Sequence, residues 1–450
     1  MRVLFVSNDL IAGHLAYLLR TEGHEVRLFI HEEGRRNNFD GLVDKSLDWK
    51  ADVEWVGKDG LIVFDDIGFG DEQDSLRAQG YTVFGGSALG DKLEQDRVFG
   101  QEVFAACGMR APESHDFATV ADALAFVQTH REAWVVKQNG HSSKSVNYVG
   151  FFEDGRDVLD VLRSYTTEAI VEGDPITLQR RVEGEEIAVT RYFNGHDWIG
   201  PSLINIEHKK FFPGDLGPTT SEMGTLGWYD TDEQNPLYLE TLAKLKPFLT
   251  KAGYRGVVDV NCIVNETGVY PLEATSRPGS PIVHLQTELN QSSWSELLLA
   301  IAKGQPYDLK VSRGYSIVVA VTVPPFPYAK KIPGHSQIGT QVYFLDTMTP
   351  EDMAHVHFEE ISWHAEKEHH YISDDRGYVL YVTGTGTSVE AARASAYGRI
   401  KKLYVPKMMY RTDIGTRFIE RSRDHLEAWG YLPSQASYFQ PLLKMLNVRS

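Results

Sequence analysis

The sequence has only two cysteines among its 450 residues, Cys107 and Cys262, and they stand far apart. This excludes a disulfide framework, a zinc knuckle and a paired-cysteine redox motif, and it predicts a reducing, cytoplasmic setting. No apolar run reaches the roughly 18 residues that a membrane-spanning helix needs. Met1–Val6 passes directly into a polar segment, so we expect a first β-strand here, no signal peptide and no membrane partner.

Positive charge is also in short supply. The 45 lysines and arginines are outnumbered by 62 aspartates and glutamates, giving a formal net charge of -17 at pH 7. Such a charge would repel a nucleic-acid polymer from most of the surface, although a local basic site could still bind a small phosphate ligand. The length predicts a multidomain protein of about three units.

The first hundred residues alternate short apolar runs with amphipathic stretches such as 14–20. The apolar runs are 3–6, 26–30, 61–64 and 81–84. This rhythm is typical of a parallel sheet covered by helices, whose ligands usually bind at the carboxyl ends of the strands. Asn8 and Gly13 would lie there and are candidate substrate-binding residues. The alternative is that they only form the turn that any strand needs.

A different pattern begins near residue 96, with two helix-like segments, a β-rich block, and later a strand and a helix opened by Ser388. The Pro-rich segment 324–327 indicates a domain boundary before this last unit. The expected elements are helices at 97–106, 119–130 and 388–404, a β-rich block at 133–192, and strands at 316–323 and 379–382. The predicted domains are 1–95, 96–325 with a lid subdomain at about 125–190, 326–421, and a helical tail at 422–450.

The segment Trp134–Val146 combines a strand ending in Lys137 with a Gly/Ser loop that carries Lys144. Two ammonium groups and several backbone N–H groups in such a loop suit a polyphosphate. We therefore predict a nucleotide-binding loop, and the alternative is a solvated hairpin with two surface lysines.

A second cluster contains Asp259 and Glu273 on two apolar strands joined by the turn 265–268. The two acids are expected to face one another across this hairpin. Paired carboxylates suit Mg²⁺ bound to a triphosphate, because magnesium prefers hard oxygen ligands and keeps substrate phosphates in its shell. Arg277 could then neutralise charge on a reacting carboxylate. The alternative is a hairpin whose acids point to solvent.

These lysines, the Glu183–Glu186 segment and the distal acid pair, in this order, resemble the ATP-grasp superfamily. The likeness to the phosphoribosylamine-glycine ligase family is closer and spans roughly residues 1 to 421. The stretches that carry it are 80–87, 93–99, 208–210, 214–220, 222–224 and 411–417. The resemblance implies an α/β and α+β multidomain protein with an ATP-grasp fold, an N-terminal Rossmann-like pre-ATP-grasp domain and a C-terminal α/β domain.

The resemblance also implies an ATP-dependent, ADP-forming carboxylate-amine ligase that works through an acyl phosphate, with ATP and Mg²⁺ (or Mn²⁺) as cofactors. It is expected to act on a small carboxylate and an amine, as a monomer or homodimer. The expected ATP-binding residues are Arg97, Lys137, Lys144, Gln179, Val182 and Glu186, and the expected metal ligands are Asp259, Glu273 and Thr275. The expected substrate-binding residues are Asn8, Gly13, His208, Lys209, Asp215, Pro218, Thr219 and Arg277, of which Arg277 is expected to be catalytic together with Lys144.

The sequence differs from that family where the substrates would bind. The glycine-rich, Arg-containing loop after the first strand is here Asn8–His14, the adenine hinge reads Leu178–Val182 without acids, and Thr275 replaces an asparagine. The resemblance therefore predicts the reaction class and leaves open whether the chain makes glycinamide ribonucleotide for purine synthesis or joins another acid and amine. A catalytically silent nucleotide-binding protein is a second hypothesis. A third is a metal site on the histidines of the C-terminal unit, which are otherwise explained as an exposed polar segment: His355, His357, His364, His369 and His370.

Overall fold

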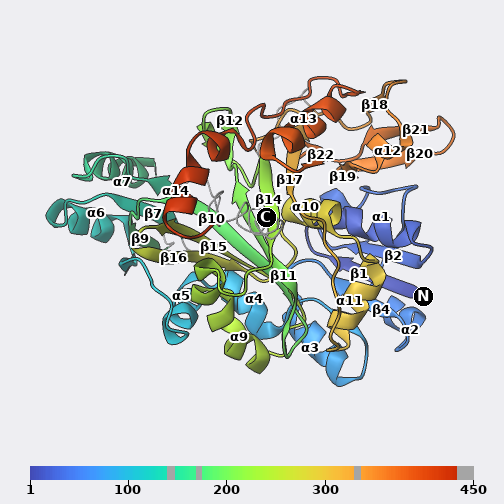
Figure 1. Cartoon of the computed structure of the whole chain (residues 1–450), viewed down its shortest axis with the longest axis horizontal. Helices are drawn as coiled ribbons and strands as arrows, with labels where there is room; N and C mark the ends of the chain where they lie inside the picture. Colours follow the sequence, from blue (N-terminus) through green and yellow to red (C-terminus); the bar gives the residue numbers. More distant parts are fainter. Residues whose placement is uncertain (139–146, 169–174, 329–335, 433–450) are drawn as a thin grey trace, which may run out of the picture.

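The computed structural model describes residues 1–138, 147–168, 175–328 and 336–432. Figure 1 shows a central sheet with the N-terminal sheet on one side and a projecting lobe of two helices and short strands on the other. Among the described residues, no helix is both long enough and apolar enough to cross a membrane.

The N-terminal unit is a five-stranded sheet in the order β3-β2-β1-β4-β5, and all its strand pairs are parallel. Its strands are β1 (Arg2–Ser7), β2 (Glu25–Ile30), β3 (Asp44–Lys45), β4 (Leu61–Phe64) and β5 (Val83–Phe84), and its helices are α1 (Gly13–Thr21), α2 (Asp52–Val56) and α3 (Gly70–Ala78). The predicted Rossmann-like alternation is confirmed. Because β1 and β4 are neighbours and parallel, the residues that follow them share one edge of the sheet.

The projecting lobe has its own small hydrophobic core. Four strands in the order β6-β9-β7-β8 pack on two helices through Trp134, Val136, Leu178, Val127 and Leu162. The strands are β6 (Ser114–Phe117), β7 (Trp134–Gln138), β8 (Tyr148–Val149) and β9 (Ile176–Arg180), and the helices are α6 (Val120–Thr129) and α7 (Arg156–Glu168).

An eight-stranded antiparallel sheet forms the centre of the molecule, in the order β16-β15-β10-β11-β14-β17-β22-β19. Its strands are β10 (Glu185–Phe193), β11 (Trp198–Glu207), β14 (Gly224–Asp230), β15 (Gly256–Asn265), β16 (Gly268–Thr275), β17 (Tyr315–Thr322), β19 (Val356–Phe358) and β22 (Tyr378–Gly386). The sheet continues past residue 325, because β17 pairs with β22. The C-terminal segment therefore extends this sheet, and the domain boundary at 325 stays a prediction.

Helices and small hairpins surround this sheet. The helices are α4 (Ala88–Gln95), α5 (Arg97–Ala106), α8 (Pro236–Glu240), α9 (Leu242–Lys251), α10 (Ile282–Leu289), α11 (Trp294–Ala302), α12 (Pro350–Met353), α13 (Val389–Ile400) and α14 (Arg423–Ala428). The hairpins and short pairs are β12 (Lys210–Phe212) with β13 (Leu216–Thr219), β20 (Ile361–His364) with β21 (His369–Ile372), and β18 (Tyr343–Phe344) with β23 (Leu403–Tyr404).

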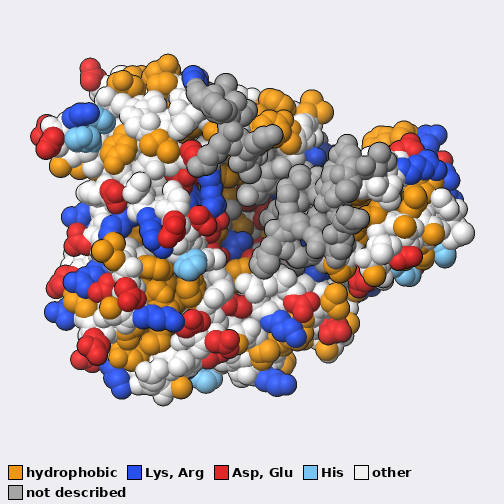
Figure 2. Space-filling view, turned by 180° about the vertical axis from the view of Figure 1, so that it is seen from behind, with side chains coloured by type: hydrophobic (Ala, Val, Ile, Leu, Met, Phe, Trp, Pro, Cys, Tyr) orange, Lys and Arg blue, Asp and Glu red, His pale blue; other side chains and the backbone are white. Residues whose placement is uncertain are grey.

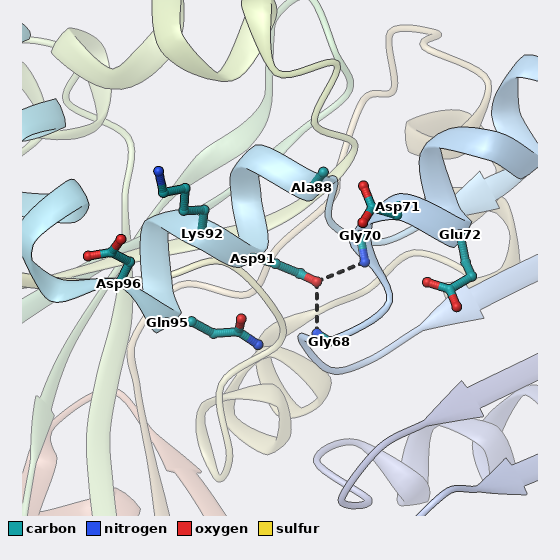
Figure 3. Close-up of a pocket in the computed structure, with 9 residues that line it drawn as sticks. All are labelled: Gly68, Gly70, Asp71, Glu72, Ala88, Asp91, Lys92, Gln95 and Asp96. Atoms are coloured by element: carbon teal, nitrogen blue, oxygen red, sulfur yellow. Dashed lines mark hydrogen bonds between the residues drawn. The ribbon is translucent and has the colours of Figure 1, made fainter. Parts of the chain in front are cut away.

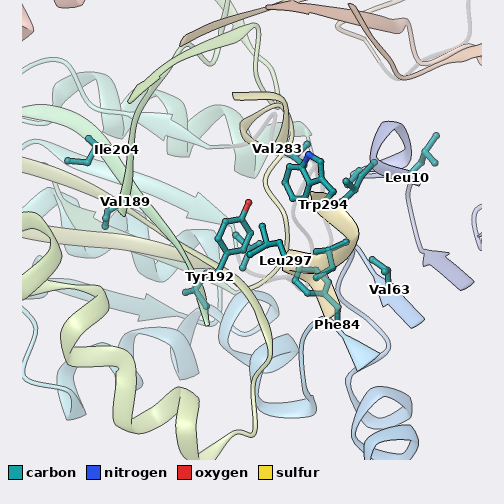
Figure 4. Close-up of a cluster of buried hydrophobic side chains, with 14 of the residues drawn as sticks. Leu10, Val63, Phe84, Val189, Tyr192, Ile204, Val283, Trp294 and Leu297 are labelled. Atoms are coloured by element: carbon teal, nitrogen blue, oxygen red, sulfur yellow. The ribbon is translucent and has the colours of Figure 1, made fainter. Parts of the chain in front are cut away.

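Helix α11 joins the two main sheets into one core. Figure 4 shows Trp294 and Leu297 of this helix between Val63 and Phe84 of the parallel sheet and Tyr192 of the antiparallel sheet. All five side chains are buried. Burying such residues stabilises by roughly 1.5–3 kcal/mol each, so the core resists separation of the two sheets.

The prediction of a helix over 388–404 is correct at its start and wrong at its end. Ser388 caps α13, but the helix ends at Ile400. Leu403 and Tyr404 instead pair with Phe344 and Tyr343, because two apolar residues at this point gain more from a strand pairing than from another helical turn. Of the predicted helical tail, α14 is described and residues 433–450 lie outside the described residues.

Candidate active site on the polar face of the central sheet

The central sheet has one apolar and one polar face. Successive strand residues point to opposite faces, and the apolar set, which includes Ile187, Val189 and Val260, lies in the core. The polar set is Glu186 and Thr190 on β10, Asn205 and Glu207 on β11, Asp259 and Asn261 on β15, and Glu273 and Thr275 on β16, with the strand register bringing them into adjacent rows. Eight polar side chains on one face of a central sheet form a candidate site.

The strand register corrects the predicted pairing of the two acids. Asp259 lies opposite Thr275, whereas Asn261 lies opposite Glu273. The expectation that Asp259 faces Glu273 directly was therefore wrong by one pair of residues. The side chain of Asp259 is only 2% exposed and accepts a hydrogen bond from Thr190. Burial, reinforced by the charge of Glu207, raises the pKa of Asp259 to about 7.

Glu273 and Asn261 present hard oxygen atoms beside positive charge. The side chain of Glu273 is 50% exposed and lies 3.9 Å from the guanidinium of Arg97. Glu273 and Arg97 line a small pocket between α4, α5 and β16. The amide group of Asn261 donates weakly to Glu207, at 3.3 Å, which leaves its carbonyl oxygen to other partners.

The oxygen atoms of Glu273 and Asn261 suit magnesium that is also bound by a substrate, and they are too few for a metal ion bound by protein side chains alone. Within the described residues no group of three or more His, Cys, Asp or Glu side chains is arranged to hold a metal ion. Magnesium is usually bound by one or two carboxylates together with substrate phosphates. Glu273 with the oxygen of Asn261 provides such a partial site.

Lys209 connects the acids of this face. Its Nζ lies 2.8 Å from Glu186 and 2.9 Å from Glu207. Burial opposes the charge of Lys209, but the two glutamates raise its pKa well above the usual value. Glu222 is buried nearby, and desolvation together with Glu207 raises its pKa. The ribose contact predicted for Glu186 and the substrate contact predicted for Lys209 would therefore lie next to each other.

Lys137 extends from the projecting lobe toward this face. Its Nζ donates to Gln179 Oε1 at 2.6 Å, so two predicted ATP-binding residues touch each other. Burial and the charge of Arg97 lower the pKa of Lys137 to about 8, while Glu273 and Glu186 act in the opposite direction. Val182 lies half-buried between β9 and β10. Lys144, predicted to be catalytic, lies outside the described residues.

Binding of Mg·ATP at pH 9 is expected to take up close to one proton. The free protein has Lys137 mostly neutral at this pH, because its pKa of about 8 is below the usual value. Nearby phosphates favour the ammonium form and would restore the proton. Calorimetric titration in buffers of different ionisation enthalpy measures the uptake, which should be small at pH 7. A K137R variant keeps its charge and should show little uptake at either pH; equal uptake by both proteins would contradict the assignment.

Arg277 follows β16 and is held in a fixed position by Glu94 of α4. Its Nε donates to Glu94 Oε1 at 3.1 Å, and the other oxygen of Glu94 accepts from the backbone N–H of Ser276 at 2.7 Å. Burial alone would lower the pKa of Arg277, but Glu94 and Asp66 raise it above the usual value. A charged arginine is thus positioned four residues beyond Glu273.

The predicted substrate loop divides into two parts. Lys209 faces the polar sheet, whereas His208 and Asp215 contact the C-terminal segment 411–417. His208 accepts a hydrogen bond from the N–H of Gly415, and burial lowers its pKa to about 3. Asp215 accepts from Arg411 and Arg417 at 2.9 and 3.1 Å. Pro218 is half-buried and Thr219 exposed, both on β13.

Replacing Arg411 by alanine is expected to lower the free energy of unfolding by about 3 kcal/mol, because the buried side chain would leave a cavity and two carboxylates would lose their cation. The side chain of Arg411 is 1% exposed and bonds to Asp413, Asp215 and the carbonyl of Lys210. Thermal unfolding should show a melting temperature lower by several degrees. The variant R313A, at an exposed arginine, should change it by less than 1 °C, and an equal effect of both would contradict this view of the Arg411 contacts.

Asn8 and Gly13, the predicted substrate-binding residues of the N-terminal unit, differ in their surroundings. Asn8 is partly exposed directly after β1. Gly13 is buried, and a Cβ atom there would lie 2.5 Å from Leu10 and 2.7 Å from Phe39. Packing therefore explains the glycine at position 13, and its contact with substrate stays a prediction.

The histidines of the C-terminal unit are not all part of an exposed segment. His357 is fully buried, and it and His355 both bond to Glu288 of α10, at 3.1 and 2.5 Å. The ring of His357 also contacts those of His14 and His284. His364, His369 and His370 lie apart on the β20–β21 hairpin. The buried carboxylate of Glu288 explains His355 and His357, and the prediction that these two histidines belong to an exposed segment was wrong.

Several residues of the site were missed in the sequence. Asn261, Glu207 and Glu222 belong to the polar face, and Glu94 positions Arg277. The period-two alternation of polar residues within apolar strands, as at Asp259 and Asn261, could have identified the first two. Glu94 lies more than 180 positions from Arg277, and nothing local signals that pair. Figure 2 shows the face opposite to Figure 1, which is hollowed near its centre where acidic and basic side chains gather beside the grey atoms.

Comparisons with known proteins agree with this arrangement. Residues 95–281 match the family model of the phosphoribosylglycinamide synthetase ATP-grasp (A) domain. The phosphoribosylamine-glycine ligase of Streptomyces coelicolor is 25% identical over 349 residues, which cover 76% of this chain and 80% of the relative. The crystal structure of the Thermotoga maritima enzyme of that name covers 92% of this chain and 100% of its own, with a TM-score of 0.69 and 18% identity.

A further solved structure shares the fold. The biotin carboxylase domain of the Hydrogenobacter thermophilus 2-oxoglutarate carboxylase, in complex with Mg·ADP, ADP and bicarbonate, covers 96% of this chain and 99% of its own. Its TM-score is 0.62 at 12% identity. The predicted fold class is confirmed: residues 95–281 form an ATP-grasp domain, and most of the chain is distantly related to phosphoribosylamine-glycine ligases.

Proposed function

We propose that the chain is an ATP-dependent, ADP-forming ligase that joins a carboxylate to an amine through an acyl phosphate. The observation that carries this proposal is the convergence, on one polar sheet face, of Glu273 and Asn261 with the cations Arg97 and Lys137. Arg277 is held by Glu94 just beyond the end of the same strand, β16. A site of cations and hard oxygen ligands suits phosphoryl transfer, which depends mainly on positioning and charge neutralisation.

The protein's own residues have distinct proposed roles toward ATP. Lys137 and Arg97, with Lys144, bind the phosphates. Gln179 positions Lys137, and the backbone near Val182 contacts the adenine. Glu186 accepts from the ribose hydroxyls, and Lys209 holds its carboxylate in place. The projecting lobe, predicted as a lid at about 125–190, would cover the nucleotide and exclude water.

Magnesium would be held by Glu273 and the carbonyl oxygen of Asn261. When bound, it neutralises charge on the phosphates of ATP. Thr275 adds a hydroxyl on the same face, and the metal contact that the resemblance implies for Asp259 would need access to a side chain that is buried and already bonded to Thr190. Glu273 is therefore the proposed principal ligand.

Arg277 is proposed to hold the carboxylate substrate. A carboxylate oxygen attacks the γ-phosphorus, ADP leaves, and an acyl phosphate forms. The amine then attacks the carbonyl carbon and loses a proton, and phosphate leaves with the oxygen that came from the carboxylate. Arg277 can donate to this oxygen in both steps, because Glu94 keeps the guanidinium charged and fixed.

Glycine and phosphoribosylamine are the first substrate pair to test, because the relatives are named for that reaction. Hydroxylamine is a general substitute for the amine, since it converts an acyl phosphate to a hydroxamate without needing a specific pocket. We expect hydroxamate and ADP from Mg·ATP, hydroxylamine and one member of a panel of amino acids and small carboxylic acids. Binding of Mg·ATP without turnover on any acid would reject the ligase and favour the silent nucleotide-binding protein.

A further inference from the structure

Carboxyl groups gather at the carboxyl ends of β1 and β4, where the N-terminal sheet meets the C-terminal segment. We define the acid cluster as Asp9, Asp65, Asp66, Glu359, Glu360 and Asp374. All are buried except Asp9, whose side chain is 39% exposed. Asp9 and the pair Asp65 and Asp66 follow adjacent parallel strands, and Glu359 and Glu360 directly follow β19.

Three arginines act on these six carboxyl groups: Arg35, Arg376 and, at Asp65 and Asp66, Arg277. Arg35 is buried and lies 2.9 Å from Asp374, 3.1 Å from Glu359 and 3.6 Å from Glu360. Arg376 lies nearer the surface and pairs with Asp9 at 2.7 Å. Because burial outweighs these cations, the pKa values of Glu359 and Glu360 rise to about 8. These two carboxyl groups are largely protonated at pH 7, and a bound cation would favour their charged form.

Four of its oxygen atoms are buried without a hydrogen bond from the described part of the chain: Asp9 Oδ1, Asp65 Oδ1, Glu359 Oε2 and Glu360 Oε1. Asp9 Oδ1 and Glu360 Oε1 face Arg376 and Arg35 at 2.7 and 3.6 Å, and the hydroxyl of Ser7 lies beside the carboxyl group of Asp65. Glu359 Oε2 is therefore the clearest vacant acceptor. Asp65 and Glu359 lie within electrostatic reach of each other although they belong to different units. A buried acceptor without a donor costs free energy of the order of 1–3 kcal/mol. Such atoms in a substrate-binding region suggest that the donor belongs to a ligand.

The backbone N–H groups that could bind a phosphate at this edge are already used by carboxylates. Asp65 accepts from the N–H of Ala12 at 2.7 Å, and Asp66 accepts from the N–H of Asp9 at 3.0 Å, so the loop after β1 is occupied. Figure 3 shows the same arrangement after β4, where Asp91 accepts from Gly68 and Gly70 at 2.8 and 2.7 Å. Helix N-termini and glycine loops bind phosphate through such backbone N–H groups. A phosphate here would have to displace the carboxylate of Asp65, Asp66 or Asp91 from them.

The acid cluster adjoins the proposed chemistry. Asp65 and Asp66 both lie within electrostatic reach of Arg277, which follows the strand that carries Glu273. A ligand bound at Asp65 and Glu359 would thus lie on the Arg277 side of the ATP site, where the second substrate of a ligase must approach the acyl phosphate.

We propose that the amine substrate is an unphosphorylated organic cation, whose ammonium group is bound by the acid cluster through Asp65 and Glu359. This rests on the ligase function proposed above. A diamine or a basic amino acid has the required chemistry, since one cationic group can be held by the carboxylates while another nitrogen attacks. A sugar phosphate amine would place its phosphate against six carboxyl groups whose neighbouring N–H donors are occupied.

The experiment measures binding of 1,4-diaminobutane, lysine and glucosamine 6-phosphate by calorimetry in the presence of Mg·ADP. We expect at least one of the two cations to bind with Kd below about 1 mM and glucosamine 6-phosphate to bind at least tenfold more weakly. The variant E359Q keeps the size of the side chain and places an amide group at the vacant oxygen. It should weaken cation binding about tenfold or more.

The exposed variant E366Q makes the same substitution elsewhere and should leave binding unchanged. Because E359Q could disturb the contact with Arg35, D65N, at the other proposed ligand, is measured in parallel and each melting temperature is recorded. Absence of binding by both cations, tighter binding of glucosamine 6-phosphate, or folded E359Q and D65N proteins with unchanged cation affinity would overturn the proposal.

Failure of this proposal can be told apart from failure of the ligase function. Hydroxamate formation needs Arg277 and the ATP site but no amine pocket, so in the wild-type protein it reports the ligase function alone. A protein that forms hydroxamate but binds neither cation retains the ligase function and loses the cationic substrate. A protein that binds the cation but forms no hydroxamate with any acid loses the ligase function alone.

Discussion

An E273A variant is expected to release ADP from Mg·ATP about 10²–10³-fold more slowly than the wild-type protein, in the range found when a key charge-stabilising group is removed from an active site. Glu273 lies opposite Asn261 and beside Arg97, so its loss removes the only carboxylate of this oxygen pair. The assay follows ADP with a coupled spectrophotometric reaction, at several Mg²⁺ concentrations. High Mg²⁺ should recover part of the activity, because the remaining oxygen ligands still bind the metal weakly.

The fold should tolerate this change, since the side chain of Glu273 is half-exposed and its replacement leaves no buried cavity. We expect the melting temperature of E273A to stay within a few degrees of the wild-type value. E266A, on the exposed turn of the same hairpin, is the matched control and should retain full activity. Unchanged ADP release by E273A at low Mg²⁺ would remove Glu273 from the metal site.

An R277A variant is expected to lower kcat for hydroxamate formation by about 10²-fold while the affinity for ATP changes little. In the proposed mechanism Arg277 donates to the carboxylate oxygen on which charge changes, and it is held there by Glu94 and the carbonyl of Pro278. R277K should recover only part of the activity, because lysine cannot reproduce the planar fork of the guanidinium.

Chemical rescue separates this role from a structural one. Added guanidinium at millimolar concentration should raise the activity of R277A several-fold and leave the wild-type protein unaffected. E94Q tests the positioning: it should lower kcat about tenfold, because Arg277 keeps its charge but loses its main partner. An R277A protein that is folded, binds ATP and turns over at the wild-type rate would exclude Arg277 from the reaction.

Local patterns were enough to predict four strands and the first helix of the N-terminal unit, whereas β3, α2 and α3 were not predicted. The apolar runs at 3–6, 26–30 and 61–64 became strands β1, β2 and β4, and the helix over 97–106 has the predicted bounds. Each of these depends on side-chain periodicity and capping residues that act within one element. The helix at 388–404 failed at its end because the pairing of Leu403 with Phe344 is a tertiary contact.

The candidate site was predictable in its residue types and less so in its geometry. Glu273, Lys137 and Arg97 do lie together, but the partner of Glu273 is Asn261, two residues from the expected Asp259. The alternation of polar and apolar residues does not tell which of residues 259 and 261 lies opposite Glu273, because both point to the same face of the sheet. The acid cluster was missed altogether, since Asp65 and Glu359 are polar residues next to strand ends and only the fold brings them together.

Transfer of oxygen from the carboxylate to phosphate tests the central claim most directly. Amino acids and small acids labelled with ¹⁸O in the carboxyl group are incubated with the protein, Mg·ATP and hydroxylamine, and the phosphate is analysed by mass spectrometry. An acyl phosphate intermediate predicts that one ¹⁸O atom appears in each phosphate formed with the accepted acid. Phosphate that carries no label from any acid would show that ATP is not used to activate a carboxylate, and it would contradict the proposed ligase.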